Sequence, residues 1–255
     1  MTLSARFFRW HRWLGWLVAL QVLAWIAGGL AFTWLPFKPW VKGEEAVAKP
    51  QLEMPAQWAE HLARYVAASS AAGAQPPLAA VLAVHSVATA SGAALRLRHA
   101  TSETWLAASG GVLAAPDAQA IAAYARQLYR GEGALGEVIR LEQVPPRLLI
   151  VREAGARKNL WRTSFDDAIG TRLYFDGRSG ELVAVRNDAW VLYDFFWRLH
   201  LMDYSEGEDF NHWLVRAASL LAFGFLLTGL VLSALALRRA WRQWRGRRRR
   251  QQTHA

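Results

Sequence analysis

The side chains in this sequence that are best suited to chemistry are histidines at the borders of long apolar runs. Three histidines stand at such borders: His11, His200 and His212. A neutral imidazole can transfer a proton near physiological pH or bind a metal, so each of the three is a candidate ligand. Aromatic residues lie close to each in the sequence, so anchoring at a membrane interface or packing under aromatic rings would also explain them.

Few other patterns in the sequence point to catalysis, and no catalytic residue is assigned. The chain has no cysteine, which excludes disulfides, thiolate metal sites and cysteine nucleophiles. It also has no Gly-rich phosphate loop, G-x-S-x-G or H-E-x-x-H sequence. Asp166 and Asp167 are neighbours in a predicted strand and would point to opposite faces, so they are not expected to form a general acid–base pair. The acidic residues Asp203, Glu206, Glu208 and Asp209 could hold a hard cation or ferric iron, but their spacing differs from that of calcium loops and a solvated loop is favoured.

Two uncharged runs near the ends of the chain are long enough to cross a membrane. Segment 13–37 contains 25 residues without a charge, and segment 217–237 contains 21. A helix needs about 20 such residues to cross the roughly 30 Å of a hydrocarbon core. We therefore predict membrane-spanning helices over 13–37 and 213–238. The alternative for the first run is a cleaved signal peptide, but the run is too long for one and no convincing cleavage site follows it.

The charges around these runs predict which side of the membrane each part occupies. Arginines are concentrated in the flanking segments 1–12 and 239–255, whereas segment 38–212 carries 18 Lys or Arg against 20 Asp or Glu. Short basic flanks stay in the cytoplasm, so both termini are predicted inside and the middle outside, in the periplasm or the cell exterior. Anionic lipid headgroups explain the net charge of +10 better than nucleic acid does. Ten of the 14 tryptophans flank the two runs, as interfacial aromatic belts do.

The region between the spans, 38–187, is predicted to fold as two helix-plus-sheet units, about 50–115 and 116–187. The first unit begins with a helical stripe over 54–69, which follows a proline-broken tether. Short runs with strand character come next: 78–88, 92–100 and 103–109.

The second unit repeats this order. Its helix is predicted over 116–130, with Asp117 at its start. The clearest hairpin of the chain covers 171–188, where Gly177 and Gly180 can take positive φ. Helices therefore do not alternate with single strands, and the predicted fold class is α+β rather than α/β. The further strand candidates of this unit are 135–144, 147–153 and 159–167.

Three stretches of the sequence resemble a known family. The stretch RFFRWHRWLGW resembles the first helix of PepSY-associated transmembrane proteins, and LYFDGRSGELVAVR resembles the last hairpin of PepSY domains. The aromatic and acidic approach to the second span, 188–212, resembles that of short, two-span members. The resemblance implies a bacterial inner-membrane protein with a periplasmic PepSY-like region. Larger relatives act as membrane reductases of ferric siderophores, and in these, histidines near the helix ends hold b-type haem.

The resemblance implies that the chain binds haem b and takes part in transmembrane electron transfer linked to iron or siderophore uptake. His11, His200 and His212 would be ligands of the haem iron, and Arg216 would either snorkel outward or face a haem propionate. A six-coordinate haem needs two imidazoles. His11 and His212 stand at opposite faces of the membrane, roughly 30 Å apart. The pair would therefore be His200 with His212, or the same histidine from two subunits of a homodimer.

The approach to the second span is where an electron acceptor is expected to bind. A ferric siderophore or a redox partner protein would bind there if the chain is an oxidoreductase of the ferric reductase type. The alternative is a non-enzymatic module whose periplasmic region binds or regulates a partner, such as a peptidase or a transporter, while the helices only anchor it. The expected acceptor surface comprises Trp197, Asp203, Tyr204, Glu206 and Asp209.

Overall fold

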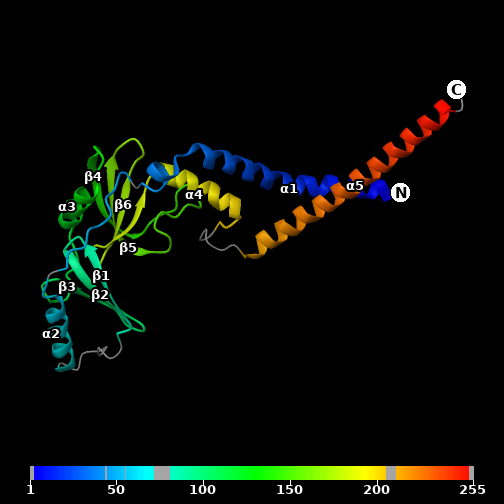
Figure 1. Cartoon of the computed structure of the whole chain (residues 1–255). Helices are drawn as coiled ribbons and strands as arrows, with labels where there is room; N and C mark the ends of the chain where they lie inside the picture. The colour runs from blue at the N-terminus through cyan, green and yellow to red at the C-terminus, as the bar shows by residue number, and fades with distance from the viewer. Residues whose placement is uncertain (1–2, 44, 55, 72–80, 205–210, 253–255) are drawn as a thin grey trace. The chain divides into compact units, whose positions relative to one another are not determined.

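Helices stand at both ends of the chain and strands in the middle, as Figure 1 shows for the computed structural model. The model describes residues 3–43, 45–54, 56–71, 81–204 and 211–252. The helices are α1 (Leu3–Trp34), α2 (Trp58–Ala71), α3 (Ala118–Leu128), α4 (Asp188–Leu201) and α5 (Trp213–Gln252), with a π-helical turn over Phe37–Val41. The strands are β1 (Ala83–Thr89), β2 (Gly92–Arg98), β3 (Glu103–Ala107), β4 (Ala134–Gln143), β5 (Lys158–Asp166), β6 (Arg172–Asp176) and β7 (Leu182–Arg186).

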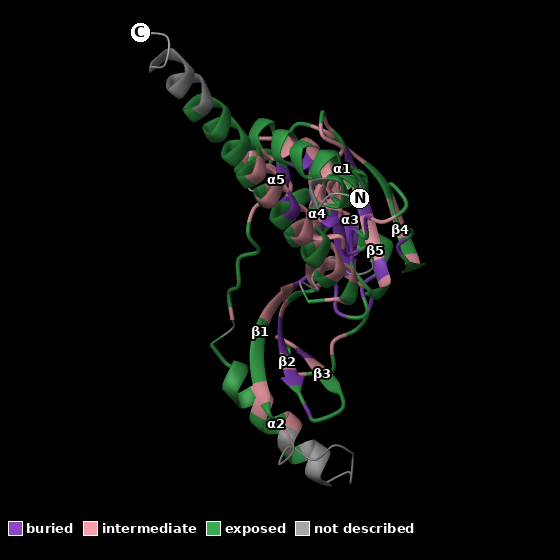
Figure 2. Cartoon of the chain, turned by 90° about the vertical axis from the view of Figure 1, so that its right-hand side faces the viewer, coloured by how far each residue is buried: buried purple, intermediate pink, exposed green. Residues whose placement is uncertain are grey.

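The first and last helices, α1 and α5, are long and apolar enough to span a membrane. The suitable segments are Ala5–Trp34, with 30 residues, and Trp213–Arg245, with 33. Large apolar side chains on both helices are exposed, for example Leu20 at 77% and Leu220 at 72%, and Figure 2 shows exposed residues along each helix. In water such surfaces would associate, whereas a bilayer would cover them. Two candidate spans at the predicted places are thus confirmed.

The chain divides into two compact units, and the first comprises residues 1–31 and 196–255. Within this unit α1 packs against α5 through small residues. A Cβ atom added at Gly15 or at Gly229 would lie 3.2 Å from a side chain of the facing helix. Thr228 is buried at the same contact. Small residues allow two helices to approach closely, which is how spanning helices usually associate.

The second compact unit, residues 32–195, contains both sheets. Its first sheet is antiparallel and has the order β1-β2-β3. Helix α2 packs against the buried face of this sheet through Leu62 and Tyr65. A helix followed by an antiparallel sheet is thus present in the first predicted unit, although its first strand begins at Ala83 and segment 72–80 lies outside the described residues. The buried sheet residues are Leu95, Leu97 and Leu106.

The second sheet is also antiparallel, with the order β4-β5-β6-β7, and α3 packs against it. The carboxylate of Asp117 accepts a hydrogen bond from the Ala120 N–H, so it caps α3 as predicted. The two sheets are separate, but the Ala90 N–H donates to the Gly180 carbonyl between them. The α+β class is therefore confirmed. The core of the second sheet and α3 comprises Val47, Ile121, Tyr124, Ala125, Leu128, Phe165, Leu173 and Phe175.

The predicted hairpin over 171–188 is confirmed as β6 and β7. Gly180 has a φ of +71°, as expected for a turn glycine. Gly177 is required for a different reason, because a Cβ atom there would collide with the Asn159 carbonyl. One glycine is thus explained by local backbone geometry and the other by a neighbouring strand.

The predicted strand over 147–153 is wrong. Arg147 and Val151 exchange two backbone hydrogen bonds, of 2.8 and 2.9 Å, and close a tight loop between them. Leu148 and Leu149 take positive φ angles of 46° and 69° inside this loop. Two prolines stand directly before the segment, and because they lack N–H groups they cannot continue the ladder of β4.

The predicted aromatic approach, 188–212, is helical in its first half as α4. The side chain of Asn187 accepts a hydrogen bond of 2.7 Å from the Trp190 N–H and so caps this helix. The ring of Tyr193, in the second turn, lies 4.7 Å from the ring of Phe32. The first half of α4 therefore packs against the C-terminal end of α1.

Candidate functional site

His11 lies inside the contact between α1 and α5. Its Nδ1 is 3.0 Å from Oγ1 of Thr228. Its ring stacks on that of Phe225, with centroids 4.2 Å apart and planes inclined by 11°. A Cβ atom at Gly229 would lie 3.2 Å from Cε1 of His11, so any larger residue would crowd the imidazole. Just over one turn of α5 thus supplies a hydrogen bond, a stacking partner and the space for the ring.

The hydrogen bonds of Thr228 favour one tautomer of His11. The Thr228 hydroxyl donates to the Phe225 carbonyl over 2.8 Å. With its hydrogen directed there, Oγ1 accepts from His11, and this arrangement favours the neutral tautomer with the hydrogen on Nδ1. Nε2 then bears a lone pair. An imidazole with one nitrogen held by the protein and the other unprotonated is the usual arrangement of a metal-bound histidine.

The packing of α1 on α5 places His11 level with the middle of the second apolar run. Thr228 lies 16 residues after His212, which is about 24 Å along α5 by helix rise. This separation is shorter than the expected 30 Å, because contacts with Thr228 and Gly229 set how the two helices are offset. It is still too long for His11 and His212 to share one iron. Arg12, next to His11, is exposed and places a positive charge at the same level.

His200, in the last turn of α4, is exposed and lies beside two aromatic rings. Its ring centroid is 5.8 Å from that of Trp25 on α1 and 6.3 Å from that of Trp197. The Trp25 indole N–H donates to the His200 carbonyl over 3.0 Å, and Gln21 donates to the Leu199 carbonyl over 2.9 Å. Side chains of α1 thus satisfy carbonyls at the end of α4, which would otherwise have no helical partners.

His212 directly precedes α5 and closes the connection from α4. Its Nε2 lies 3.3 Å from the Leu201 carbonyl, which can only accept, so Nε2 carries the hydrogen. The His212 carbonyl in turn accepts from the backbone N–H of Arg216 over 3.3 Å. The Arg216 side chain is exposed. His212 therefore uses for packing the nitrogen that a haem iron would normally occupy.

The three candidate histidines lie at two different heights along the helices of the first compact unit. His200 and His212 both lie at the end of α4. His11 precedes Trp25, the α1 neighbour of His200, by 14 residues, or about 21 Å by helix rise. In the part of the chain that the structure describes, no three His, Asp or Glu side chains gather as a metal site.

The predicted acceptor surface is partly buried. Trp197 is half-buried, whereas Tyr204 is 45% exposed. Asp203 is only 3% exposed, so the expectation of a solvated loop is wrong for this residue. Glu206 and Asp209 lie outside the described residues.

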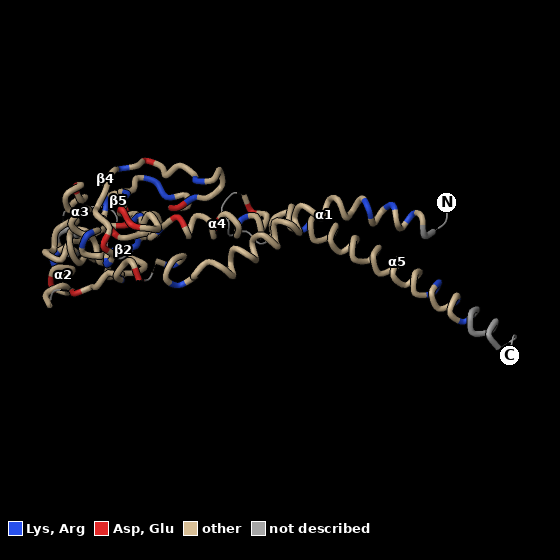
Figure 3. The backbone as a smooth tube through the Cα atoms, turned by 90° about the horizontal axis from the view of Figure 1, so that it is seen from above, with Lys and Arg blue, Asp and Glu red and all other residues tan. Residues whose placement is uncertain are grey.

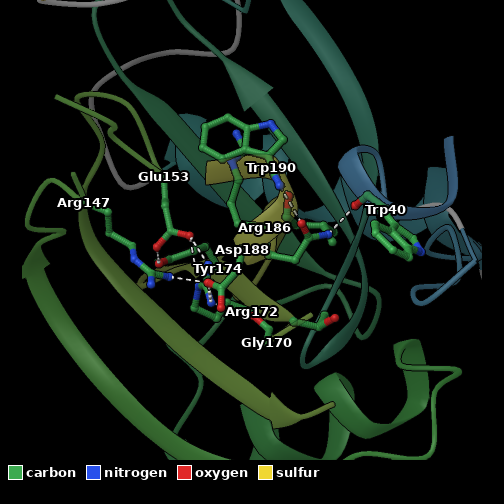
Figure 4. A network of polar contacts seen from close by, with 12 residues as sticks. Trp40, Arg147, Glu153, Gly170, Arg172, Tyr174, Arg186, Asp188 and Trp190 are labelled. Carbon is green, nitrogen blue, oxygen red and sulfur yellow. Dashed lines mark hydrogen bonds and ion pairs between the residues drawn. The ribbon is translucent and has the colours of Figure 1, made fainter. Parts of the chain in front are cut away.

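A network of charges at the start of α4 was not predicted (Figure 4). Glu153 is 2% exposed. Its Oε1 accepts from Nε and Nη2 of Arg172, over 3.0 and 2.6 Å, and its Oε2 accepts from the Tyr174 hydroxyl over 2.8 Å. Nη1 of Arg172 and Nη1 of Arg147 both donate to Oδ1 of Asp188, over 2.9 and 2.8 Å. Residues from β6, α4 and the β4–β5 loop are thus held together.

The electrostatics of this network are those of a structural ion pair. Burial alone would lower the pKa of Arg172, but the hydrogen bonds and charge of Glu153 outweigh it and raise that pKa. Burial, followed by the charge of Glu153, raises the pKa of Tyr174. Arg172 therefore stays charged and Tyr174 stays neutral over the physiological range. Because Glu153 and Arg172 are 19 residues apart and share no motif, no local pattern reveals the pair.

Asp166 is the last residue of β5, and Asp167, which follows the strand, has a structural role. Asp166 is exposed. Asp167 accepts from the Tyr129 hydroxyl over 2.8 Å and from the Thr171 N–H over 2.9 Å. Burial alone would raise the pKa of Asp167, but hydrogen bonds, chiefly from Thr171, outweigh it and hold that pKa below the usual value. Ionised Asp167 therefore joins the end of β5 to the end of α3.

We expect Asp167→Asn to lower the free energy of unfolding by about 1 kcal/mol at pH 7, a low value for a charged hydrogen-bonded group because the carboxylate is partly solvated. The folded-state pKa is depressed, so this stability is complete well above the unfolded-state pKa of about 3.9 and is lost as pH falls through the folded-state pKa. The difference between wild type and variant should therefore shrink towards pH 3. Thermal unfolding in detergent from pH 7 to pH 3 measures it, with Asp166→Asn as the exposed control. A stability difference between wild type and Asp167→Asn that does not change with pH would contradict the structural role of the ionised Asp167 carboxylate.

A polar cleft of about 700 Å³ lies in the second unit near the ends of β2 and β5. His99, which lines it, is 6% exposed, and its Nδ1 has no hydrogen-bond partner within the described part of the chain. No residue predicted to be functional lies in this cleft. The other polar and aromatic residues of its lining include Arg98, Glu103, Trp105, Lys158 and Arg178.

Comparison of the chain with protein-family models, with curated proteins and with solved structures finds no match. The α+β class by itself does not indicate an activity, because one fold can carry many functions. The function is therefore inferred from the geometry of the candidate site.

Proposed function

We propose that this chain is a two-span protein of a bacterial inner membrane that binds haem b and transfers electrons across the membrane in connection with iron or siderophore uptake. In this proposal it is a short PepSY-associated transmembrane protein, with a PepSY-like region in the periplasm and both termini in the cytoplasm. The observation that carries the proposal is the state of His11. Its Nε2 bears a lone pair inside the contact of two helices that can span a membrane.

The residues around His11 fit one side of a b-type haem. Thr228 holds Nδ1–H and leaves Nε2 for iron, and Phe225 covers one face of the imidazole. The exposed Arg12 offers a positive charge to a propionate. Bound haem would supply a one-electron carrier. The groups of the chain would orient the iron ligand, exclude water and balance the negative charge of the propionates.

A second copy of the chain would supply the second axial ligand. His200 is about 21 Å from His11 along α1 by helix rise, so it cannot pair with His11. The Nε2 of His212 is directed at the Leu201 carbonyl. Their contacts favour packing roles for His200 and His212. Two His11 side chains from a homodimer would hold the haem, which gives one haem for two chains.

The acceptor would approach at the turn after α4. Tyr204 and Arg216 are exposed near this turn, so they can meet a ferric siderophore or a redox partner protein. The exposed guanidinium of Arg216 would attract an acceptor that bears carboxylate or phenolate oxygens. Electrons would thus pass from a cytoplasmic donor towards the outer face.

The test is the absorption spectrum of the full-length protein, purified in detergent from cells with an ample haem supply. We expect b-type bands in the reduced-minus-oxidised spectrum, a dimer, and one haem for two chains. A colourless preparation would refute haem binding. A reporter enzyme fused after Arg250 should be active only in the cytoplasm, and activity restricted to the periplasm would refute the orientation.

A second candidate function is the binding of a protein partner, and an apolar groove favours it. The groove has a volume of about 430 Å³ and lies between α2 and the first sheet. Val84 is 45% exposed and Trp58 is 42% exposed at its rim. Strand β1 is at the edge of its sheet, so an extended peptide could pair with it and place side chains in the groove. Met54, Leu62 and Leu95 complete the apolar lining.

If the groove binds a partner, a photoreactive residue in place of Val84 should form a crosslink to one protein in cells. The same residue in place of Val112, which is 69% exposed outside the groove, is the matched control. Trp58→Ala should weaken binding by about 30-fold, because a buried tryptophan anchor contributes about 2 kcal/mol. Equal crosslinking at Val84 and Val112 would argue against the groove. A specific adduct from a colourless protein would favour this function over haem binding.

A further inference from the structure

The loop that joins β4 to β5, residues 144–157, carries two exposed leucines at its tip. Leu149 is 92% exposed and Leu148 is 51% exposed. Their φ angles of 69° and 46° lie in the left-handed region, which leucine rarely adopts because its Cβ crowds the backbone. Single exposed leucines are common on protein surfaces. Two adjacent ones, held outward at a cost to the backbone, indicate a contact surface.

Contacts within the second compact unit place this loop beside the end of the first span. Arg147, at the base of the tip, forms an ion pair of 2.8 Å with Asp188, the first residue of α4. Tyr193 is five residues further along α4, about 7.5 Å by helix rise. Its ring packs against those of Phe32 and Phe37, where α1 ends. The leucine pair is therefore held near the point where the chain leaves the first apolar run.

Positive charge surrounds the leucine pair. Arg147 and Arg152 stand on either side of it, Arg157 and Lys158 follow, and all four are exposed. Figure 3 shows blue segments along this hairpin. Glu153, the acidic residue between them, is buried and already paired with β6. Asp188 balances the charge of Arg147, so Arg152, Arg157 and Lys158 leave the exposed charge of the loop positive. Basic residues around an apolar tip are typical of segments that bind an anionic membrane surface.

We propose that Leu148 and Leu149 insert into the outer interface of the bilayer while Arg152 and Arg157 bind lipid phosphates. The loop is then a membrane contact of the region between the spans, in addition to its covalent links to α1 and α5. The partner is lipid, because headgroups are the surface expected where α1 leaves the bilayer and their charge is complementary. The proposal rests on α1 and α5 spanning the bilayer and is independent of haem binding.

Spin labels on single cysteines test this contact in the full-length protein. Because the chain has no cysteine, each variant reports one position. Leu149→Cys probes the tip, and Leu20→Cys, at a position 77% exposed on α1, is the reference for lipid. Val112→Cys, at an apolar position 69% exposed in the second unit, is the matched control. Each labelled variant is placed in vesicles of phosphatidylethanolamine and phosphatidylglycerol, and its collisions with oxygen and with a water-soluble nickel complex are measured.

We expect the label at Leu149 to favour oxygen over nickel, as at Leu20, and the label at Val112 to favour nickel. Without phosphatidylglycerol, Leu149 should shift towards nickel while Leu20 does not; no shift would overturn the role of the arginines. A water-exposed Leu149 with a lipid-exposed Leu20 would overturn the loop contact alone. A water-exposed Leu20 would overturn the membrane spans and the proposal with them. Shielding of Leu149 from both reagents would indicate a protein contact and would also overturn it.

Discussion

Replacing His11 with alanine is expected to abolish the b-type absorption of the purified protein. In the proposed dimer the two His11 side chains would hold the haem, so one substitution would remove both ligands. His85→Ala is the matched control, because His85 is exposed on β1 and no part of the haem proposal uses it. The reduced-minus-oxidised spectrum and the ratio of haem to chain measure the effect. Retention of the full spectrum by His11→Ala would refute the assigned ligand.

The variant Thr228→Val separates the ligand from the group that positions it. Valine nearly keeps the shape of threonine but removes the hydroxyl that accepts from Nδ1 of His11. Loss of such a supporting hydrogen bond typically costs about 10–100-fold in metal affinity, and we expect haem affinity to fall by this factor. Thr228→Ser restores the hydroxyl and should restore the affinity. Unchanged affinity in Thr228→Val would show that the inferred tautomer is wrong.

Arg172→Met is expected to destabilise the second compact unit by about 3–5 kcal/mol, which is the usual effect of removing one partner of a buried ion pair. Methionine nearly fills the space but leaves the Glu153 carboxylate, 3% exposed, with the Tyr174 hydroxyl as its remaining partner in the network. Thermal or urea unfolding in detergent, followed by circular dichroism, measures the loss. The changed stability should appear without a change in the haem spectrum, because the network belongs to a different compact unit from His11.

An exposed ion pair provides the control for this prediction. Glu137 pairs with Arg162 over 3.4 Å, and its side chain is 64% exposed. Glu137→Gln should therefore change stability by less than about 1 kcal/mol. The double variant Arg172→Met, Glu153→Gln should recover part of the loss, because a buried neutral amide costs less than a buried unpaired carboxylate. Equal effects of Arg172→Met and Glu137→Gln would mean that the buried network is not important for stability.

Local patterns were sufficient to predict many elements of the fold. The uncharged runs predicted both long helices, because apolar length is a property of consecutive residues. Asp117 marked the start of α3, and Gly180 marked the turn between β6 and β7. Each of these features depends on residues within a few positions of one another. The same locality explains why the α+β class could be predicted.

The same patterns failed where the chain depends on distant partners. The run over 147–153 has the apolar composition of a strand, yet Arg147 is held by Asp188, 41 residues away, and the chain closes into a tight loop. Asp203 has the composition of a solvated turn but is buried after α4. The composition of a segment describes only that segment. It gives no information about the surface against which the segment packs in the folded chain.

For the candidate site, the sequence by itself determined the residue types and their order: a histidine near the start of one apolar run and arginines beside it. Only the tertiary structure decided that His11 meets Thr228 and Phe225, which are more than 200 positions away. The physical reason is that periodicity and charge act along one helix, whereas the proton on Nδ1 depends on how two helices are offset. Close packing at Gly15 and Gly229 sets that offset. The sequence pattern of either helix alone does not reveal this packing.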